Sequence, residues 1–160
     1  MKRVWYYIIG GGLVAGTVSL LAMSNTGKQL ETVASGRIHK LTLTGVIVKI
    51  DIKLKNPTNG KLKLRFPFIK LSHGDSTIGS SKPLNTVIEI PQHGEAVAKD
   101  ITIEIPYLSI LFSAKDLVKE FKSGNAVKVL LTTKSAIVLA FNKEIPYEKK
   151  EDIVLKQATA

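Results

Sequence analysis

The feature that most constrains the fold is a run in which apolar and polar side chains alternate with a period of two. The apolar members of this run are Val46, Val48, Ile50, Ile52 and Leu54. Because successive side chains of a β-strand point to opposite faces, the run predicts a strand with one buried and one solvated face. Asn56-Pro57-Thr58-Asn59-Gly60 then predicts a turn, since these residue types favour turns by several mechanisms. The alternation resumes over 62–68.

Similar but shorter patterns recur along the rest of the chain. Strands are expected at 37–44, 77–79, 86–90, 96–105, 126–133 and 136–145. Between Ser109 and Lys122 the apolar residues instead follow a helical stripe, and Ser123-Gly124-Asn125 supplies a C-cap. Repeated short strands with frequent turns are typical of an all-β sandwich or barrel, here with one short helix between two late strands.

The N-terminus differs in kind from the rest of the chain. Residues 1–3 are basic, and residues 4–23 carry no charge over a length that matches a bilayer's hydrocarbon core. We expect a transmembrane helix with its N-terminus inside; the alternative is a cleaved signal peptide. The residues that favour an anchor are the interfacial aromatics Trp5, Tyr6 and Tyr7, with Gly12 and Gly16 as a small-residue pair that permits close helix approach. Residues 24–35 read as a linker, 36–155 as the folded domain and 156–160 as a tail.

Charge is concentrated in the first half of the predicted domain. The whole chain has 23 Lys and Arg against 13 Asp and Glu, a net charge of +10. The alternation places six basic residues on solvated faces: Lys49, Lys53, Lys55, Lys61, Lys63 and Arg65. If the strands flanking the Asn-Pro turn pair with each other, these residues form one patch; if they belong to different sheets, the residues still line outer surfaces. Such a patch indicates either a solvated, aggregation-resistant edge or a site for an anionic partner.

Residues with catalytic potential are few and scattered. The chain has no cysteine, which excludes disulfides, thiol nucleophiles and Cys-ligated zinc. His39, His73 and His93 are isolated in sequence, without a second ligand at metal-binding spacing. There is no Gly-x-Ser-x-Gly elbow and no phosphate-binding loop. We therefore expect no enzyme activity, no catalytic or metal site and no cofactor.

Residues 46–79, VIVKIDIKLKNPTNGKLKLRFPFIKLSHGDSTIG, resemble a known family. The alternating strand, the Asn56-Pro57 turn, the second strand and the small Ile-Gly hairpin are similar to those of late embryogenesis abundant type 2 proteins, also called the WHy domain. The resemblance covers roughly residues 32–155. It implies a Greek-key, fibronectin-like β-sandwich, tethered by an N-terminal helix, with a non-catalytic role in dehydration stress, at membranes or in defence.

Two functions remain open from the sequence. The first is a membrane-anchored, non-enzymatic binding or protective protein whose domain lies outside the cytoplasm and whose basic residues meet anionic headgroups. The second is a structural component of a membrane-containing virion or an envelope assembly, where the partner is a protein shell. Specific nucleic-acid binding is not expected, because Phe66 and Phe68 fall on the apolar face rather than among the basic residues. The oligomeric state is left open.

Overall fold

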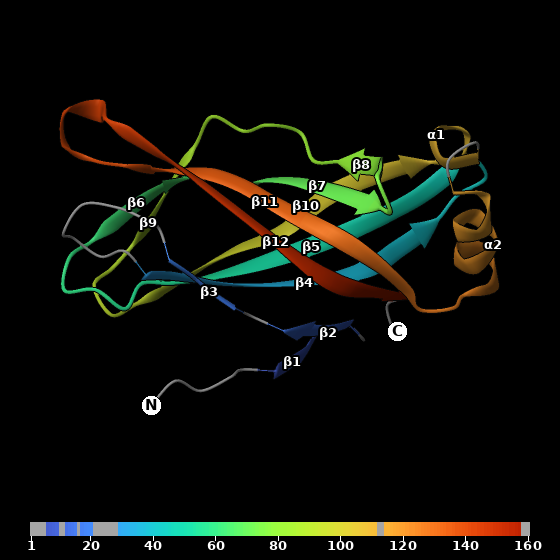
Figure 1. The fold of residues 1–160 in the computed structure, drawn as a ribbon, viewed down its shortest axis with the longest axis horizontal. Helices are drawn as coiled ribbons and strands as arrows, with labels where there is room; N and C mark the ends of the chain where they lie inside the picture. Colours follow the sequence, from blue (N-terminus) through green and yellow to red (C-terminus); the bar gives the residue numbers. More distant parts are fainter. Residues whose placement is uncertain (1–5, 10–11, 16, 21–28, 112–113, 158–160) are drawn as a thin grey trace.

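The computed structural model describes residues 6–9, 12–15, 17–20, 29–111 and 114–157. Within them most residues are in strands, and the strands form one sheet that curls around a core (Figure 1). Two short helices cover one end of the curled sheet. The predicted predominance of β-structure is confirmed.

The order along the main path of the sheet is β10-β5-β4-β12-β11-β6-β9, with β7 and β8 attached beside β11. The strands after residue 28 are β4 (Gln29–Leu41), β5 (Gly45–Lys55), β6 (Leu62–Arg65), β7 (Phe68–His73), β8 (Ser76–Ser80), β9 (Val87–Ile90), β10 (Glu95–Pro106), β11 (Val127–Val138) and β12 (Glu144–Gln157). Neighbours are antiparallel except β4 and β12, which meet in parallel at one end.

The alternation of β5 produces the expected burial. Ile50, Ile52 and Leu54 are fully buried, while the intervening Asp51 and Lys53 face outward. Leu64 of β6 and Leu131 of β11 belong to the same hydrophobic cluster, so both halves of the curled sheet share one core. Burial of apolar surface at about 25 cal/mol per Å² makes this cluster the main stabilising element of the fold.

The domain begins earlier than predicted. Residues 29–35, expected as linker, form the first half of β4 and pair with β5 from Glu31 to Ser35. Leu30 and Ala34 are fully buried. The small and polar character of this segment conceals the alternation, because Thr32 and Ser35 are buried as well.

The C-terminal strands also differ from the prediction. The expected strand 126–133 and the first residues of the expected strand 136–145 form one strand, β11, which ends at Val138. The hairpin turn comes at 139–143, and residues 144 and 145 already belong to β12. This turn uses Phe141 and Asn142 with positive φ, so neither glycine nor proline marks it. The predicted tail is shortened, since Lys156 and Gln157 end β12 and pair with β4.

The single predicted helix is two helices, α1 (Tyr107–Leu111) and α2 (Lys115–Ser123). They are separated because Ala114 has a φ of −155°, outside the helical region. The predicted C-cap is confirmed: Gly124 adopts the left-handed conformation, with φ of 74°. Of the predicted stripe, Leu117, Val118 and Phe121 are buried, but Leu111 of α1 is 41% exposed.

The predicted membrane anchor is described only in part. Its described pieces are short strands, β1 (Tyr6–Ile9), β2 (Gly12–Ala15) and β3 (Thr17–Leu20), where the sequence predicted a helix. Tyr6, Tyr7 and Gly12 lie in these strands, whereas Trp5 and Gly16 lie outside the described residues. No helix in the described ranges has the length and apolarity to cross a membrane. The anchor stays a prediction.

Candidate functional site

The six basic residues predicted from the sequence are divided between two parts of the sheet. β5, which carries Lys49 and Lys53 and ends at Lys55, pairs with β4 and β10. β6, which carries Lys63 and Arg65, pairs with β11 and β9 instead. Because the inner faces of β5 and β6 contact the same core, their outer faces point away from each other. The six residues therefore form two small groups and not one patch.

Each of the six lies beside a carboxylate. The ion pairs join Lys49 to Asp100 (3.8 Å), Lys53 to Glu95 (3.0 Å), Lys55 to Glu31 (3.9 Å), Lys61 and Lys63 to Glu89 (3.3 and 3.6 Å) and Arg65 to Glu144 (2.7 Å). The hydrogen bond from Lys61 and the positive charge of both lysines hold the pKa of Glu89 below its usual value. These acids come from other strands, which is why the local sequence overstated the free positive charge.

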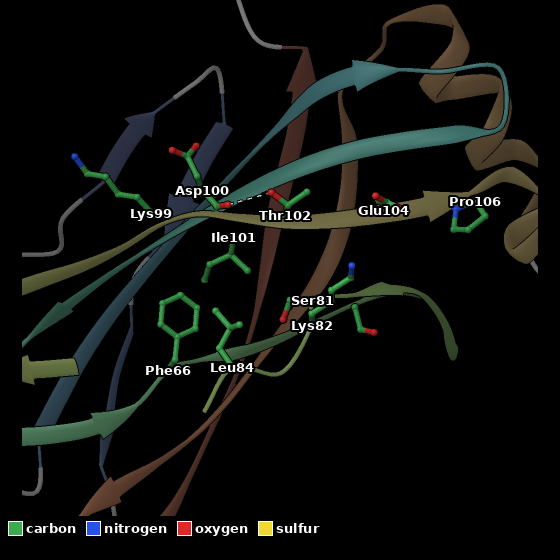
Figure 2. A pocket seen from close by; sticks show the side chains of 11 residues that line it. Phe66, Ser81, Lys82, Leu84, Lys99, Asp100, Ile101, Thr102, Glu104 and Pro106 are labelled. Atoms are coloured by element: carbon green, nitrogen blue, oxygen red, sulfur yellow. Dashed lines mark hydrogen bonds between the residues drawn. The ribbon is translucent and has the colours of Figure 1, made fainter. Parts of the chain in front are cut away.

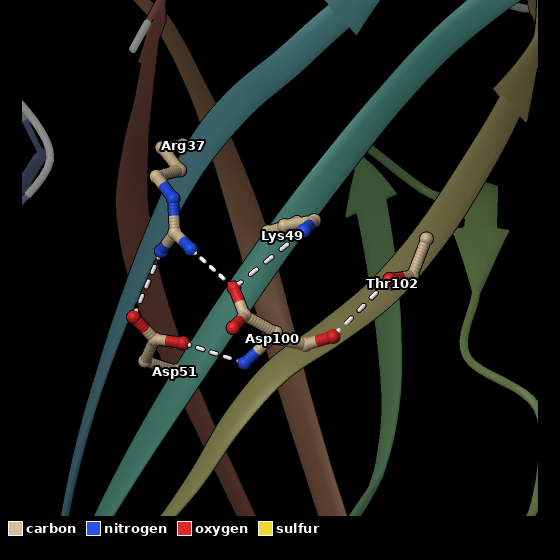
Figure 3. Close-up of polar contacts among 5 residues, drawn as sticks. All are labelled: Arg37, Lys49, Asp51, Asp100 and Thr102. Carbon is tan, nitrogen blue, oxygen red and sulfur yellow. Dashed lines mark hydrogen bonds and ion pairs between the residues drawn. The ribbon is translucent and has the colours of Figure 1, made fainter. Parts of the chain in front are cut away.

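Arg37 links the acids of neighbouring strands in a small ionic cluster (Figure 3). Its guanidinium binds Asp51 at 2.8 Å and also contacts Asp100. Asp100 sits at a bulge of β10 with φ of 55°, and its main-chain N–H donates to Asp51 Oδ1 at 2.7 Å. Together with Lys49, which lies 3.8 Å from Asp100, the cluster holds the bulge in place and balances two positive and two negative charges on the outer face of the sheet.

The Asn-Pro motif forms a buried corner. Asn56 is fully buried, and its Nδ2 donates to the carbonyl oxygens of Gly60 (2.7 Å), Pro91 (3.1 Å) and Ile90 (3.3 Å). Its Oδ1 accepts from Thr58 N–H at 3.0 Å and from the Thr58 hydroxyl at 2.7 Å. Asn56 thus ties its own turn to the end of β9, a structural role rather than a binding one. Pro57 follows it within the turn.

A buried ion pair lies on the inner face of β12. Lys149 is 4% exposed and Glu151 8%, and Lys149 Nζ lies 3.3 Å from Glu151 Oε2. Lys149 also donates to the main-chain oxygen of Thr32 on β4. Burial lowers the pKa of Lys149 and raises the pKa of Glu151, and the attraction between the two charges partly offsets both shifts.

The end of the sheet covered by α1 and α2 carries exposed apolar side chains. Leu43, in the turn between β4 and β5, is 100% exposed, Leu108 is 75% exposed and Leu111 41%. The turn and α1 are joined by a hydrogen bond from Tyr107 N to Thr44 O at 2.9 Å. We call this region, formed by 42–44, α1 and α2, the helical end (Figure 1).

The helix α2 at the same end carries three lysines. Lys115, Lys119 and Lys122 follow a spacing of four and then three residues, which places them on one stripe of the helix. Lys122 Nζ lies 4.9 Å from the centre of the Tyr107 ring, which fixes α2 against α1. Among the described residues no carboxylate pairs with any of the three, although Asp116 and Glu120 lie on the same helix.

The sequence pattern did not single out the helical end. Leu111 was assigned to the buried stripe, and Leu43 was placed within a strand. The available signal was the Thr-Leu-Thr-Gly turn at 42–45, where an apolar residue stands between turn-forming neighbours.

Comparisons with known proteins identify no relative by sequence: no family model and no curated protein matches the chain. The solved structures of similar shape include the following two. One is a protein from Archaeoglobus fulgidus, with a TM-score of 0.47 and 9% identity, covering 79% of this chain and 95% of that one. The other is a protein from Arabidopsis thaliana, with a TM-score of 0.46 and 16% identity, covering 79% of this chain and 80% of that one.

Proposed function

We propose that this chain is a non-enzymatic, membrane-anchored binding protein that acts at a membrane surface. In this proposal, residues 4–23 are the anchor, and the domain is a Greek-key, fibronectin-like β-sandwich similar to late embryogenesis abundant type 2 proteins. The surface that meets lipid is the helical end, not the six basic residues of β5 and β6.

The observation that carries the proposal is the combination of exposed leucines with lysines that no carboxylate of the described residues neutralises. Each CH₂ group transferred from water into the acyl region of a bilayer contributes about 0.8 kcal/mol. Each lysine near an anionic surface contributes about 1 kcal/mol. A lipid surface is a partner that suits both features at once, since its acyl region buries exposed leucines such as Leu43 and its anionic headgroups attract lysines.

The basic residues of β5 and β6 contribute less. A headgroup that bound Lys53 or Lys61 would have to compete with Glu95 or Glu89 for the same ammonium group. Because surface ion pairs are worth only about 0–1 kcal/mol, this competition reduces affinity without abolishing it. We therefore expect these residues to attract anionic membranes at long range and to add little once the domain is bound.

Vesicle binding by residues 29–160 tests the proposed surface. The fragment is expected to sediment with vesicles containing phosphatidylserine, more weakly as salt rises. The double variant Lys115→Glu/Lys119→Glu should weaken binding at least about 30-fold, since two favourable interactions of about 1 kcal/mol each are lost and two repulsive ones are added. Leu43→Ser should weaken binding about tenfold.

The matched control is Lys99→Glu/Lys143→Glu, which gives the same net charge on exposed residues outside the helical end. It should lower affinity by less than about threefold, through the long-range field alone. Equal losses in the two double variants would show that net charge, and not the helical end, determines binding.

Membrane extraction tests the anchor separately. The full chain should remain in the membrane pellet after washing with alkaline carbonate, because an apolar span of 20 residues is held by the hydrophobic effect and not by charge. The fragment 29–160 should be released by the same wash. Release of the full chain, or a mature N-terminus near residue 25, would contradict a retained anchor.

A second candidate function is a structural link between a membrane and a protein shell. It is favoured by the direction of β4, whose first residue, Gln29, follows the predicted anchor and whose last, Leu41, lies beside the helical end. Thirteen strand residues span about 43 Å, so the helical end of an upright domain would be far from the anchoring bilayer. If the helical end does not bind anionic vesicles, a structural link between a membrane and a protein shell becomes the better supported function.

A further inference from the structure

Large apolar side chains outside the helical end are exposed at two contrasting places. Leu84, 53% exposed, lies beside Phe66 and Ile101 in a hollow of about 500 Å³ next to β10 (Figure 2). Two lysines and two carboxylates line the same hollow, so its charges balance and favour no class of partner. Phe141 differs, because it is 96% exposed at the tip of the hairpin between β11 and β12 and packs against almost nothing in the domain.

The backbone at this tip is one in which phenylalanine is unfavourable. Lys143 N donates to Ala140 O, and the two residues between them, Phe141 and Asn142, have φ of 59° and 57°. Positive φ at both central positions is typical of a type I′ hairpin turn, which favours asparagine and glycine. A bulky side chain is rare in this left-handed conformation. Since Phe141 neither suits the turn nor packs in the core, the needs of the fold do not account for it.

The charges beside the tip suit an anionic surface. Lys143 is exposed, and no ion pair joins it to a carboxylate in the described part of the chain. Glu144, the next residue, accepts a hydrogen bond from Arg65 Nε at 2.7 Å. The tip therefore combines one large apolar side chain with one lysine, and the adjacent acid is already paired.

The hairpin lies at the end of the domain where β4 begins (Figure 1). β12 runs parallel to β4, so the first residues of both strands share one end of the sheet. The Tyr147 and Thr32 hydroxyls meet at 2.8 Å. From this contact Asn142 at the tip is five residues away, whereas Gln29 is three residues away along β4. The tip therefore projects beyond Gln29, on the side opposite the helical end.

The predicted anchor brings this end of the domain close to a bilayer. The anchor ends at residue 23 and β4 begins at Gln29, which leaves only residues 24–28 between them. Because an extended chain spans at most about 3.6 Å per residue, this segment holds Gln29 within roughly 18 Å of the membrane surface. A hairpin that projects beyond Gln29 on the same side lies within reach of the headgroups.

We propose that the tip of this hairpin docks on the bilayer that holds the anchor, with Phe141 as the inserting side chain. The contact rests on the proposed function, from which it takes the anchor, and it adds a second lipid contact at the end opposite the helical end. Phe141 enters the boundary between headgroups and acyl chains, and Lys143 meets the headgroup phosphates. The helical end then points away from this bilayer, toward a facing membrane.

A protein partner is the competing occupant of the tip. The tip offers a single large apolar side chain, which is a much smaller contact than stable protein interfaces bury. A bilayer needs no such area, because the anchor makes docking of the tip intramolecular. A weak contact is then sufficient, since the effective concentration of the membrane is high.

Quenching by a lipid-borne probe tests the contact in the full chain. The sequence contains no cysteine, so Lys143→Cys carries a single nitrobenzoxadiazole label. The labelled chain is reconstituted in phosphatidylcholine vesicles that contain nitroxide-labelled lipid. Quenching should be at least about threefold stronger with the native Phe141 than in the same labelled chain with Phe141→Asn, because the phenylalanine holds the tip at the acyl boundary.

Two controls separate insertion from orientation and from folding. A label at Leu108→Cys, in the helical end, should be quenched little in the same vesicles, since an upright domain points it away from the bilayer and neutral lipid does not attract the lysines of α2. Phe141→Asn should be at least as stable to urea as the native chain, because asparagine tolerates the left-handed conformation. A loss of stability would show that Phe141 serves the fold, and would overturn the proposal.

The outcomes distinguish the hairpin contact from the anchor. Equal quenching with phenylalanine and asparagine at position 141, in chains that alkaline carbonate does not release, would overturn the hairpin contact and leave the anchor standing. A protein partner would then be the better occupant of the tip. Release of the chain by carbonate would overturn the anchor and the hairpin contact with it. Strong quenching at position 108 would show that the domain does not stand on its hairpin end, which also contradicts the proposal.

Discussion

Replacing Lys149 with methionine is expected to lower the free energy of unfolding by about 3–5 kcal/mol at pH 7. The substitution removes one partner of an ion pair whose members are 4% and 8% exposed. It leaves the Glu151 carboxylate in the core without its counter-charge 3.3 Å away, and Thr32 O without the ammonium donor. The loss should be measured by urea denaturation of the variant and of the native chain.

The loss should depend on pH in a defined direction. Burial already raises the pKa of Glu151 above its ordinary value near 4.5, and Lys149 opposes that rise. In the variant only the backbone hydrogen bond from Ala34 still opposes it, and burial is the largest cause, so the folded state binds the Glu151 proton more tightly than the unfolded state does. Stability of the variant therefore falls as the pH rises from about 4.5 through the raised pKa. The difference from the native chain should shrink at pH 4, where Glu151 is protonated.

A double variant separates the unpaired charge from the loss of packing. Lys149→Met/Glu151→Leu removes both charges and keeps apolar volume, and buried pairs replaced in this way are often neutral or more stable. It should recover most of the stability lost by Lys149→Met. A single variant that loses less than about 1 kcal/mol at pH 7 would show that water reaches Glu151 and that the pair is not part of the core.

Period-two alternation predicted the elements whose two faces differ most. β5 and β10 have the predicted bounds to within a residue or two, because one face of each is apolar and the other is charged. β12 was not predicted beyond residue 145, since its inner face includes Lys149 and Glu151, which have the character of surface residues in the sequence. The division of β11 was wrong for a related reason: its burial pattern is irregular around Thr132 and Thr133, both of which are buried.

The candidate site shows which contacts local sequence patterns do not predict. The sequence correctly places Lys53 and Lys61 on outward faces, because orientation depends only on local alternation. It does not show that Glu95 approaches Lys53 or that Glu89 approaches Lys61, because those contacts depend on which strands pair. The exposure of Leu43 and Leu108 likewise depends on a turn and a helix that are far apart in the sequence and are joined by the hydrogen bond from Tyr107 N to Thr44 O. Strand pairing is non-local, so single-strand patterns do not determine it.

The sequence predicts the Asn-Pro motif as a turn. In the structure Asn56 also joins this turn to the end of β9, so replacing it is expected to lower the free energy of unfolding strongly. Asn56→Asp is expected to cost about 3 kcal/mol or more at pH 7, because it replaces the amide donor with an oxygen facing the carbonyls of Gly60, Ile90 and Pro91. The Oδ1 contacts to Thr58 are kept, so the change isolates the lost donors. Burial also penalises the new charge, since position 56 is fully buried.

Asn59→Asp, three residues later, is the matched control. Asn59 is exposed, and only its Oδ1 is engaged, 2.6 Å from His93 Nε2. Aspartate keeps that oxygen, so this variant should differ from the native chain by less than about 1 kcal/mol. Lowering the pH should rescue Asn56→Asp in part, because a protonated carboxyl regains one donor for the three carbonyls. Equal melting temperatures of the two variants at pH 7 would contradict this prediction. They would mean that main-chain hydrogen bonds alone stabilise the turn and that the amide of Asn56 contributes little to stability.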